Sequence, residues 1–188
     1  PILLRSTVEA YLDLFNLAKD KKYGCFLRAA EQKEWIKILR EAKKEDNPFL
    51  SGIAGEPVLD ETLSRWESEL TELKKNGHYP LRQEEKFDKA NLNPMYKSVY
   101  NFLCCYSHNN LRALRSRHVN ISVDETDFDI EYYAPIDMKR YIHYIDCLCE
   151  IIVSSSEIIH RVLDTGAQEE VKKLKDQLDV LRREIQTE

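Results

Sequence analysis

The sequence predicts an all-α protein, a bundle of five to six helices, with a small β-hairpin inserted near residues 119–133 as one alternative for that segment. Glycine and proline are scarce, at 5 and 6 of 188 residues, so turns are few and the elements between them are long. Apolar residues recur at helical spacing through most of the chain. Hydrophobic residues make up 43% and charged residues 32%, a balance typical of globular proteins rather than disordered ones.

Four elements are expected in the first half of the chain. Helices over 2–19 and 27–44 follow from apolar residues spaced three or four apart. A loop over 46–57 separates them from a third helix, which we expect to begin with Asp60 as its N-cap. That helix is expected to stop at Asn76-Gly77, because glycine readily follows a helix end.

The middle of the chain carries one strong helix signal and one ambiguous segment. A short helix is expected near 84–90. Asn93-Pro94 predicts a cap and a proline in the first turn of a helix that reaches about residue 114. Residues 119–133 alternate apolar and polar residues around an acidic stretch, which fits either a hairpin or an acidic loop.

Two helices are expected at the C-terminal end. The longest begins at Pro135 and runs to about residue 165. The last covers 168–187, and its apolar residues recur at a nearly heptad spacing: Val171, Leu174, Leu178, Leu181 and Ile185. This stripe serves either packing on the same domain or pairing with a partner chain.

Composition also limits the organisation and surroundings of the protein. A chain of this length is expected to form one domain over 1–188. The net charge of −5 argues against a surface that coats nucleic acid, but it permits a local basic pocket. Five cysteines without a C-x-x-C pair indicate reduced thiols, and no run is long and apolar enough to span a membrane. The reduced thiols predict a cytoplasmic protein. The start of the chain, at Pro1, does not resemble a signal peptide.

The residues best suited to chemistry lie between Cys104 and His118. In a helix, His108 and Arg112 are four apart and share a face, with Asn109 beside them. An imidazole can take the proton of a ribose 2′-hydroxyl, and a guanidinium can stabilise charge on phosphorus oxygens, with no metal or other cofactor. The alternative is a solvated helix end, where basic residues favour the negative pole of the dipole.

Arg112 and His118 also fit a wider signature. Their Arg-x5-His spacing is similar to the Arg-x4–6-His signature of HEPN-type domains, helical bundles that are often metal-independent ribonucleases. The resemblance implies catalytic roles for Arg112 and His118 and a site formed across a homodimer. Ala113 departs from this pattern, which usually has a polar residue after the arginine.

A second resemblance extends loosely over residues 5–162. The stretch from Arg5 to Tyr11 is similar to the Arg-Ser-x-x-Glu opening helix of an uncharacterised bacterial domain family. Tyr106-Ser107-His108 is similar to the Ser/His segment of that family. The resemblance implies that Arg5, Glu9 and His108 converge, whereas the structural alternative is an internal Arg–Glu pair that sets helix register.

Two functions from different classes follow. The leading hypothesis is a HEPN-like, metal-independent endoribonuclease acting on RNA, which by resemblance belongs to a bacterial toxin or phage-defence system. Its catalytic residues would be His108, Arg112 and His118, with Arg5, Glu9 and Asn109 supporting the site. The alternative is a non-catalytic interaction module whose last helix docks a protein partner. A metal site on the face of His143, Cys147 and Glu150 is less expected, because zinc ligands usually come from more than one segment.

Overall fold

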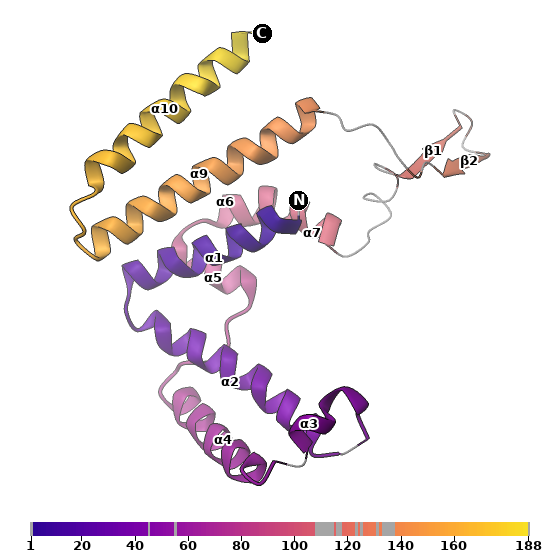
Figure 1. The fold of residues 1–188 in the computed structure, drawn as a ribbon, viewed down its shortest axis with the longest axis vertical. Helices are drawn as coiled ribbons and strands as arrows, with labels where there is room; N and C mark the ends of the chain where they lie inside the picture. Colours follow the sequence, from indigo (N-terminus) through magenta and orange to yellow (C-terminus); the bar gives the residue numbers. More distant parts are fainter. Residues whose placement is uncertain are drawn as a thin grey trace. The chain divides into compact units, whose positions relative to one another are not determined.

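The computed structural model describes residues 2–44, 46–54, 56–107, 115, 118–122, 124, 126–130, 132 and 138–187. This part of the chain consists of helices and one small antiparallel hairpin, which confirms the all-α fold class (Figure 1). Contacts group the chain into two compact units: unit 1 holds 1–18 and 87–188, and unit 2 holds 19–86. The single domain over 1–188 stays a prediction.

Unit 2 is built around two packed helices, α2 (Tyr23–Ala42) and α4 (Leu59–Lys75). The chain between them forms a 3-10 turn, η1 (Pro48–Leu50), and a short helix, α3 (Ser51–Ala54). The buried core of the unit consists of aliphatic side chains: Ala29, Ile36, Leu39, Leu59, Leu63 and Leu70. Their spacing of three or four along each helix accounts for both helices, because each turns one apolar face to the other.

The two ends of α4 give different outcomes for the two predictions made about them. The stop at Asn76-Gly77 is confirmed: Gly77 adopts φ +80, and His78 and Gly77 donate backbone hydrogen bonds to Leu73 and Lys74, a Schellman ending. The assignment of Asp60 as the N-cap is wrong, because the helix begins one residue earlier, with Val58 before it. Asp60 lies in the first turn, and its carboxylate pairs with Lys43 at 2.6 Å.

Unit 1 has a core to which distant parts of the chain contribute. Its helices are α1 (Ile2–Lys19), the C-terminal end of α5 (Gln83–Ala90), α6 (Asn93–Met95), α7 (Asn101–Ser107), α9 (Met138–Val162) and α10 (Gln168–Thr187). The buried core residues are Leu4, Val8, Leu12, Phe87, Ala90, Tyr100, Leu103 and Ile151. The first helix of the chain is thus held by residues as far along the sequence as Phe87 to Ile151.

The helix expected from Asn93 to about residue 114 has a different form. A π-helical turn, η2 (Tyr96–Tyr100), joins α6 to α7, and the described helix ends at Ser107. Asn93 is the first helical residue rather than the cap. Residues 108–114 lie outside the described residues.

The ambiguous segment after this helix contains the hairpin. Strand β1 (Val119–Ile121) pairs antiparallel with β2 (Phe128–Ile130), with Val119 opposite Ile130. Of the two alternatives, the hairpin is therefore correct.

The last two helices, α9 and α10, lie side by side in opposite directions (Figure 1). Arg182 of α10 joins them, since it pairs with Asp146 at 2.6 Å and with Glu150 at 2.9 Å. Ile158 and Val171 are buried near the turn that connects the helices. None of the described helices combines the length and the apolar character needed to cross a membrane.

A core leucine tests the packing of α1 in unit 1. Leu12→Ala removes a side chain with 0% exposure and should lower the free energy of unfolding by about 2–5 kcal/mol, because it leaves a cavity. Urea denaturation followed by circular dichroism measures this. Leu17→Ala on the same helix is the control, since Leu17 is exposed and its loss should cost less than about 1 kcal/mol. Equal losses would contradict the packing described.

Candidate functional site

The first helix brings two of the expected residues together. Arg5 and Glu9 are four residues apart on α1, and Arg5 Nε lies 3.0 Å from Glu9 Oε1. Both side chains are partly buried, with 22% and 29% of their surface exposed. An ion pair four residues apart stabilises a helix only weakly when the cation precedes the anion, as it does here. The geometry of the Arg5–Glu9 pair therefore depends on a third group.

That third group is Tyr100, the last residue of η2. Its hydroxyl donates a hydrogen bond of 2.7 Å to Glu9 Oε1 and accepts one of 3.4 Å from Arg5 Nη2. The Arg5 guanidinium carbon also lies 5.5 Å from the centre of the Tyr100 ring, within the range of a cation–π contact. We call Arg5, Glu9 and Tyr100 the polar triad.

The π-helical turn explains how Tyr100 reaches α1. Such turns insert an extra residue into a helix and are frequent at functional sites. Here the turn carries Tyr96 and Tyr100, whose rings stack with centres 5.7 Å apart, and both rings pack on Phe87. The aromatic body of Tyr100 is thereby buried while its hydroxyl meets the charged pair.

Burial and hydrogen bonding shift the pKa values of Tyr100 and Arg5. Burial raises the pKa of Tyr100, and the hydrogen bond to Glu9 raises it further, so the phenol is a proton donor at neutral pH. Burial lowers the pKa of Arg5, but its hydrogen bonds to Tyr100 and Glu9 outweigh this and raise it overall. Arg5 is therefore a cation and the Tyr100 hydroxyl a neutral donor at neutral pH.

The other predicted site residues are placed differently. His108, Asn109 and Arg112 lie outside the described residues. His118 is exposed and comes directly before β1. Among the predicted residues, only Arg5 and Glu9 are brought together within the described part of the chain.

Tyr100 is the residue that sequence analysis missed. Tyr100 lies in the core, with 3% exposure. A buried tyrosine hydroxyl usually finds a partner, and this rule was the available signal. The sequence did not indicate that the partner was Glu9, 91 residues away.

The metal site considered on α9 is not supported by the geometry. No group of three or more histidine, cysteine or acidic side chains suited to a metal occurs among the described residues. Glu150 instead pairs with Arg182, and Cys147 packs against the core of unit 1.

The triad acts chemically as a positioning device. It holds α1 against the start of α7, with Cys104 close enough to contribute to the electrostatics of both Arg5 and Tyr100. Ser107, the last residue of α7, lies two turns beyond Tyr100, and the chain then enters the segment with His108. The triad therefore fixes the helical segment that ends at Ser107.

The raised pKa of Tyr100 gives a pH-dependent prediction. Tyr100→Phe should lower the free energy of unfolding at about pH 8 by about 1–3 kcal/mol, because a hydrogen bond to a charged carboxylate is lost. A folded-state pKa above the unfolded value of about 10 makes wild-type stability fall as the pH rises above about 10. The difference between wild type and variant should therefore shrink there, in urea titrations from about pH 8 to about pH 11.

The matched control is Tyr96→Phe, on the same turn. In the part of the chain that the structure describes, the Tyr96 hydroxyl makes no hydrogen bond that would be lost. A difference that stays constant with pH for Tyr100→Phe, or an equal effect at Tyr96, would contradict the role given to the phenol.

Comparison with known proteins identifies the family of the chain. A model of a family of unknown function, DUF5677, matches residues 1–127, which include the whole triad. No curated protein and no solved structure matches the chain. These results give no support to the HEPN resemblance, whereas membership of an uncharacterised helical family is confirmed. The chain belongs to DUF5677, a family of unknown function.

Proposed function

We propose that the protein is a helical interaction module that pairs with a second copy of itself through α9 and α10. The observation that carries this proposal is an exposed isoleucine stripe on α9. Ile145, Ile152 and Ile159 are seven residues apart and between 40% and 53% exposed. A repeat of seven keeps apolar residues on one side of a helix, as in a coiled-coil seam.

The rest of α9 explains why this stripe is available. Ile151 and Ile158 are buried, and Ile151 belongs to the core of unit 1. Asp146 and Glu150 pair with Arg182 of α10. The core and α10 thus occupy other sides of the helix, and the isoleucine stripe is left uncovered.

The last helix adds a second apolar surface. Leu174, Leu181 and Ile185 are exposed, whereas Leu178 is half-buried. Each stripe extends for about 17–21 Å along its helix at 1.5 Å per residue. Exposed apolar surface of this kind on a monomer marks an interaction site.

Charge favours a second copy as the partner. The stripe positions between the isoleucines on α9 hold Leu148, Cys149, Ser155 and Ser156, none of which is charged. Two-fold pairing of identical stripes therefore brings no like charges together. A partner selected by its charge would find no complementary group on this stripe.

A second candidate function is a metal-independent endoribonuclease with His108 and Arg112 as catalytic residues. What supports it is the polar triad, which fixes the helix that leads into His108. In this scheme the imidazole removes the 2′-hydroxyl proton, the guanidinium stabilises the phosphorane-like transition state, and His118 serves as a further acid or base. RNA, the toxin or phage-defence setting and the cytoplasmic location all remain parts of this proposal.

The dimer proposal is tested by a charge on the stripe. Ile152→Glu should weaken self-association by at least about 100-fold, because an unpaired carboxylate would be buried at the seam of both copies. Sedimentation equilibrium over a range of concentrations measures this. Arg161→Glu is the control: it is exposed on the same helix but two residues from Ile159, which places it on the opposite side.

Two outcomes would overturn the proposal. Wild-type protein that stays monomeric at high concentration is one. Equal association of wild type and Ile152→Glu is the other, since the stripe would then lie outside the interface.

The nuclease proposal has its own test. Purified protein should cleave single-stranded RNA in the presence of a chelator, and His108→Ala or Arg112→Ala should abolish cleavage. Arg115→Ala is the matched control, because Arg115 is exposed and has no assigned role. Intact RNA after long incubation with concentrated, folded protein would count against the enzyme.

A further inference from the structure

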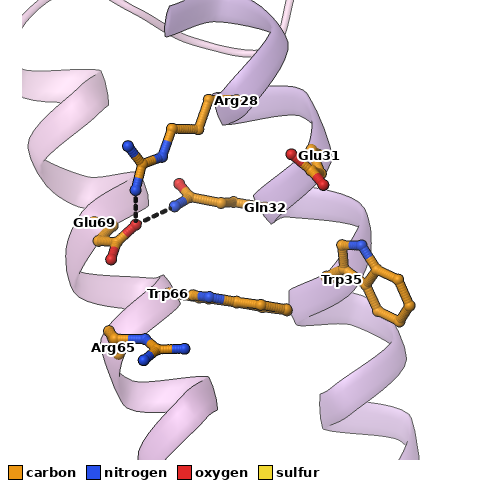
Figure 2. A pocket seen from close by; sticks show the side chains of 7 residues that line it. All are labelled: Arg28, Glu31, Gln32, Trp35, Arg65, Trp66 and Glu69. Atoms are coloured by element: carbon orange, nitrogen blue, oxygen red, sulfur yellow. Dashed lines mark hydrogen bonds and ion pairs between the residues drawn. The ribbon is translucent and has the colours of Figure 1, made fainter.

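Unit 2 contains a hollow that no function above uses. It lies between α2 and α4, has a volume of about 350 Å³ and is lined by residues of both helices (Figure 2). That volume falls at the lower end of the range for small-ligand sites, about 300–1,000 Å³. All of its lining residues belong to unit 2.

The first notable feature is a buried side-chain amide whose oxygen accepts no hydrogen bond within the described residues. Gln32 is 5% exposed, and its Nε2 donates a hydrogen bond of 2.6 Å to Glu69 Oε2. Its Oε1 is buried and has no partner within the described residues. The amide cannot simply be reversed, because Oε1 would then face the carboxylate of Glu69, an acceptor against an acceptor. The site therefore lacks a donor.

The second feature is aromatic. Trp35 and Trp66 line the hollow with ring centres 6.1 Å apart and planes inclined at 57°. Trp35 is 43% exposed, which is unusual for so large an apolar side chain. Indole rings attract cations to their faces and pack well on alkyl chains.

The third feature is the cationic side chain of Arg28 at the edge of the hollow. Arg28 Nη2 lies 2.6 Å from Glu69 Oε2, yet the Arg28 side chain is 61% exposed. Figure 2 shows the Arg28 guanidinium and the Gln32 amide meeting the same carboxylate oxygen of Glu69. Glu31 adds a further carboxylate to the lining, whereas Arg65 lies on the other side of the Trp66 indole in this view.

We propose that this hollow binds a guanidinium or primary ammonium group carried on an alkyl chain. The ligand cation replaces Arg28 at Glu69 and donates a hydrogen bond to Gln32 Oε1. Its alkyl chain packs on Trp35 and Trp66. Arg28 then acts as a placeholder: it occupies the cation position at Glu69 without ligand, and its side chain moves into solvent when the ligand binds.

Intrinsic fluorescence provides a direct measurement, because the chain has 2 tryptophans and both line the hollow. Titration with n-butylguanidinium should give a saturable change with a Kd below about 1 mM. The neutral isostere n-butylurea should bind at least about tenfold more weakly, because charge-assisted hydrogen bonds are the stronger ones. No saturable change with the cation, or equal binding of the urea, would overturn the proposal.

Variants test the individual contacts. Arg28→Ala should strengthen binding of n-butylguanidinium at least about threefold, because it removes the competing cation. Gln32→Met should weaken binding at least about tenfold. Gln83→Met is the matched control, since Gln83 Oε1 is also buried without a partner but lies outside the hollow, and binding should stay unchanged. Weaker binding by Arg28→Ala would overturn the placeholder role, and with it the proposal.

Circular dichroism checks that each variant is folded, and if Gln32→Met is not, the comparison of the two butyl probes with wild type decides.

A second pair of probes identifies the source of the cation. Blocked Gly-Arg-Gly should bind more tightly than n-butylguanidinium if the natural ligand is a protein side chain, and less tightly if it is a small amine or guanidine. The same peptide with citrulline in place of arginine should fail to bind in either case.

Discussion

The carboxylate of Glu9 is the constraint on which the described part of unit 1 depends. One oxygen, Oε1, accepts hydrogen bonds from Arg5 and from Tyr100, and so ties the first helix to a turn 91 residues away. A partly buried carboxylate is costly to desolvate unless it is both paired and hydrogen-bonded. Here both conditions are met by two partners at once. Apolar contacts are non-directional, whereas this polar contact requires one register of α1.

The same contact explains why a π-helical turn is retained in the middle of the chain. A regular α-helix from Asn93 would rotate Tyr100 away from its present direction, since each inserted residue turns the following side chains by about 100°. The stacked rings of Tyr96 and Tyr100 on Phe87 stabilise the turn from the apolar side. Packing and hydrogen bonding therefore stabilise the same local conformation of the turn. This conformation sets the direction in which α7 begins.

Local patterns predicted most of the helices but not the relations between them. The glycine stop of α4 and the heptad spacing of α10 are encoded within a few neighbouring residues, and both could be deduced from the sequence. The hairpin was only one of two alternatives, because alternating residues around an acidic stretch also fit a loop. The N-cap of α4 could not be deduced, because Asp60 pairs with Lys43, the residue that follows α2, instead of capping its own helix. Arg5 and Glu9 were identified from their short motif. Tyr100 was not, because its partner is set by tertiary packing, and a sequence shows only that the side chain is apolar enough to be buried.

The α9 helix connects the polar triad to the proposed seam. Ile151 belongs to the same buried cluster as Tyr100, while Ile152 is the next residue and is exposed. Successive residues of a helix point about 100° apart, so one helix can close the core with one side and offer its isoleucine stripe with another. A partner on the proposed seam would therefore contact the same helix that holds Ile151 in the core beside Tyr100.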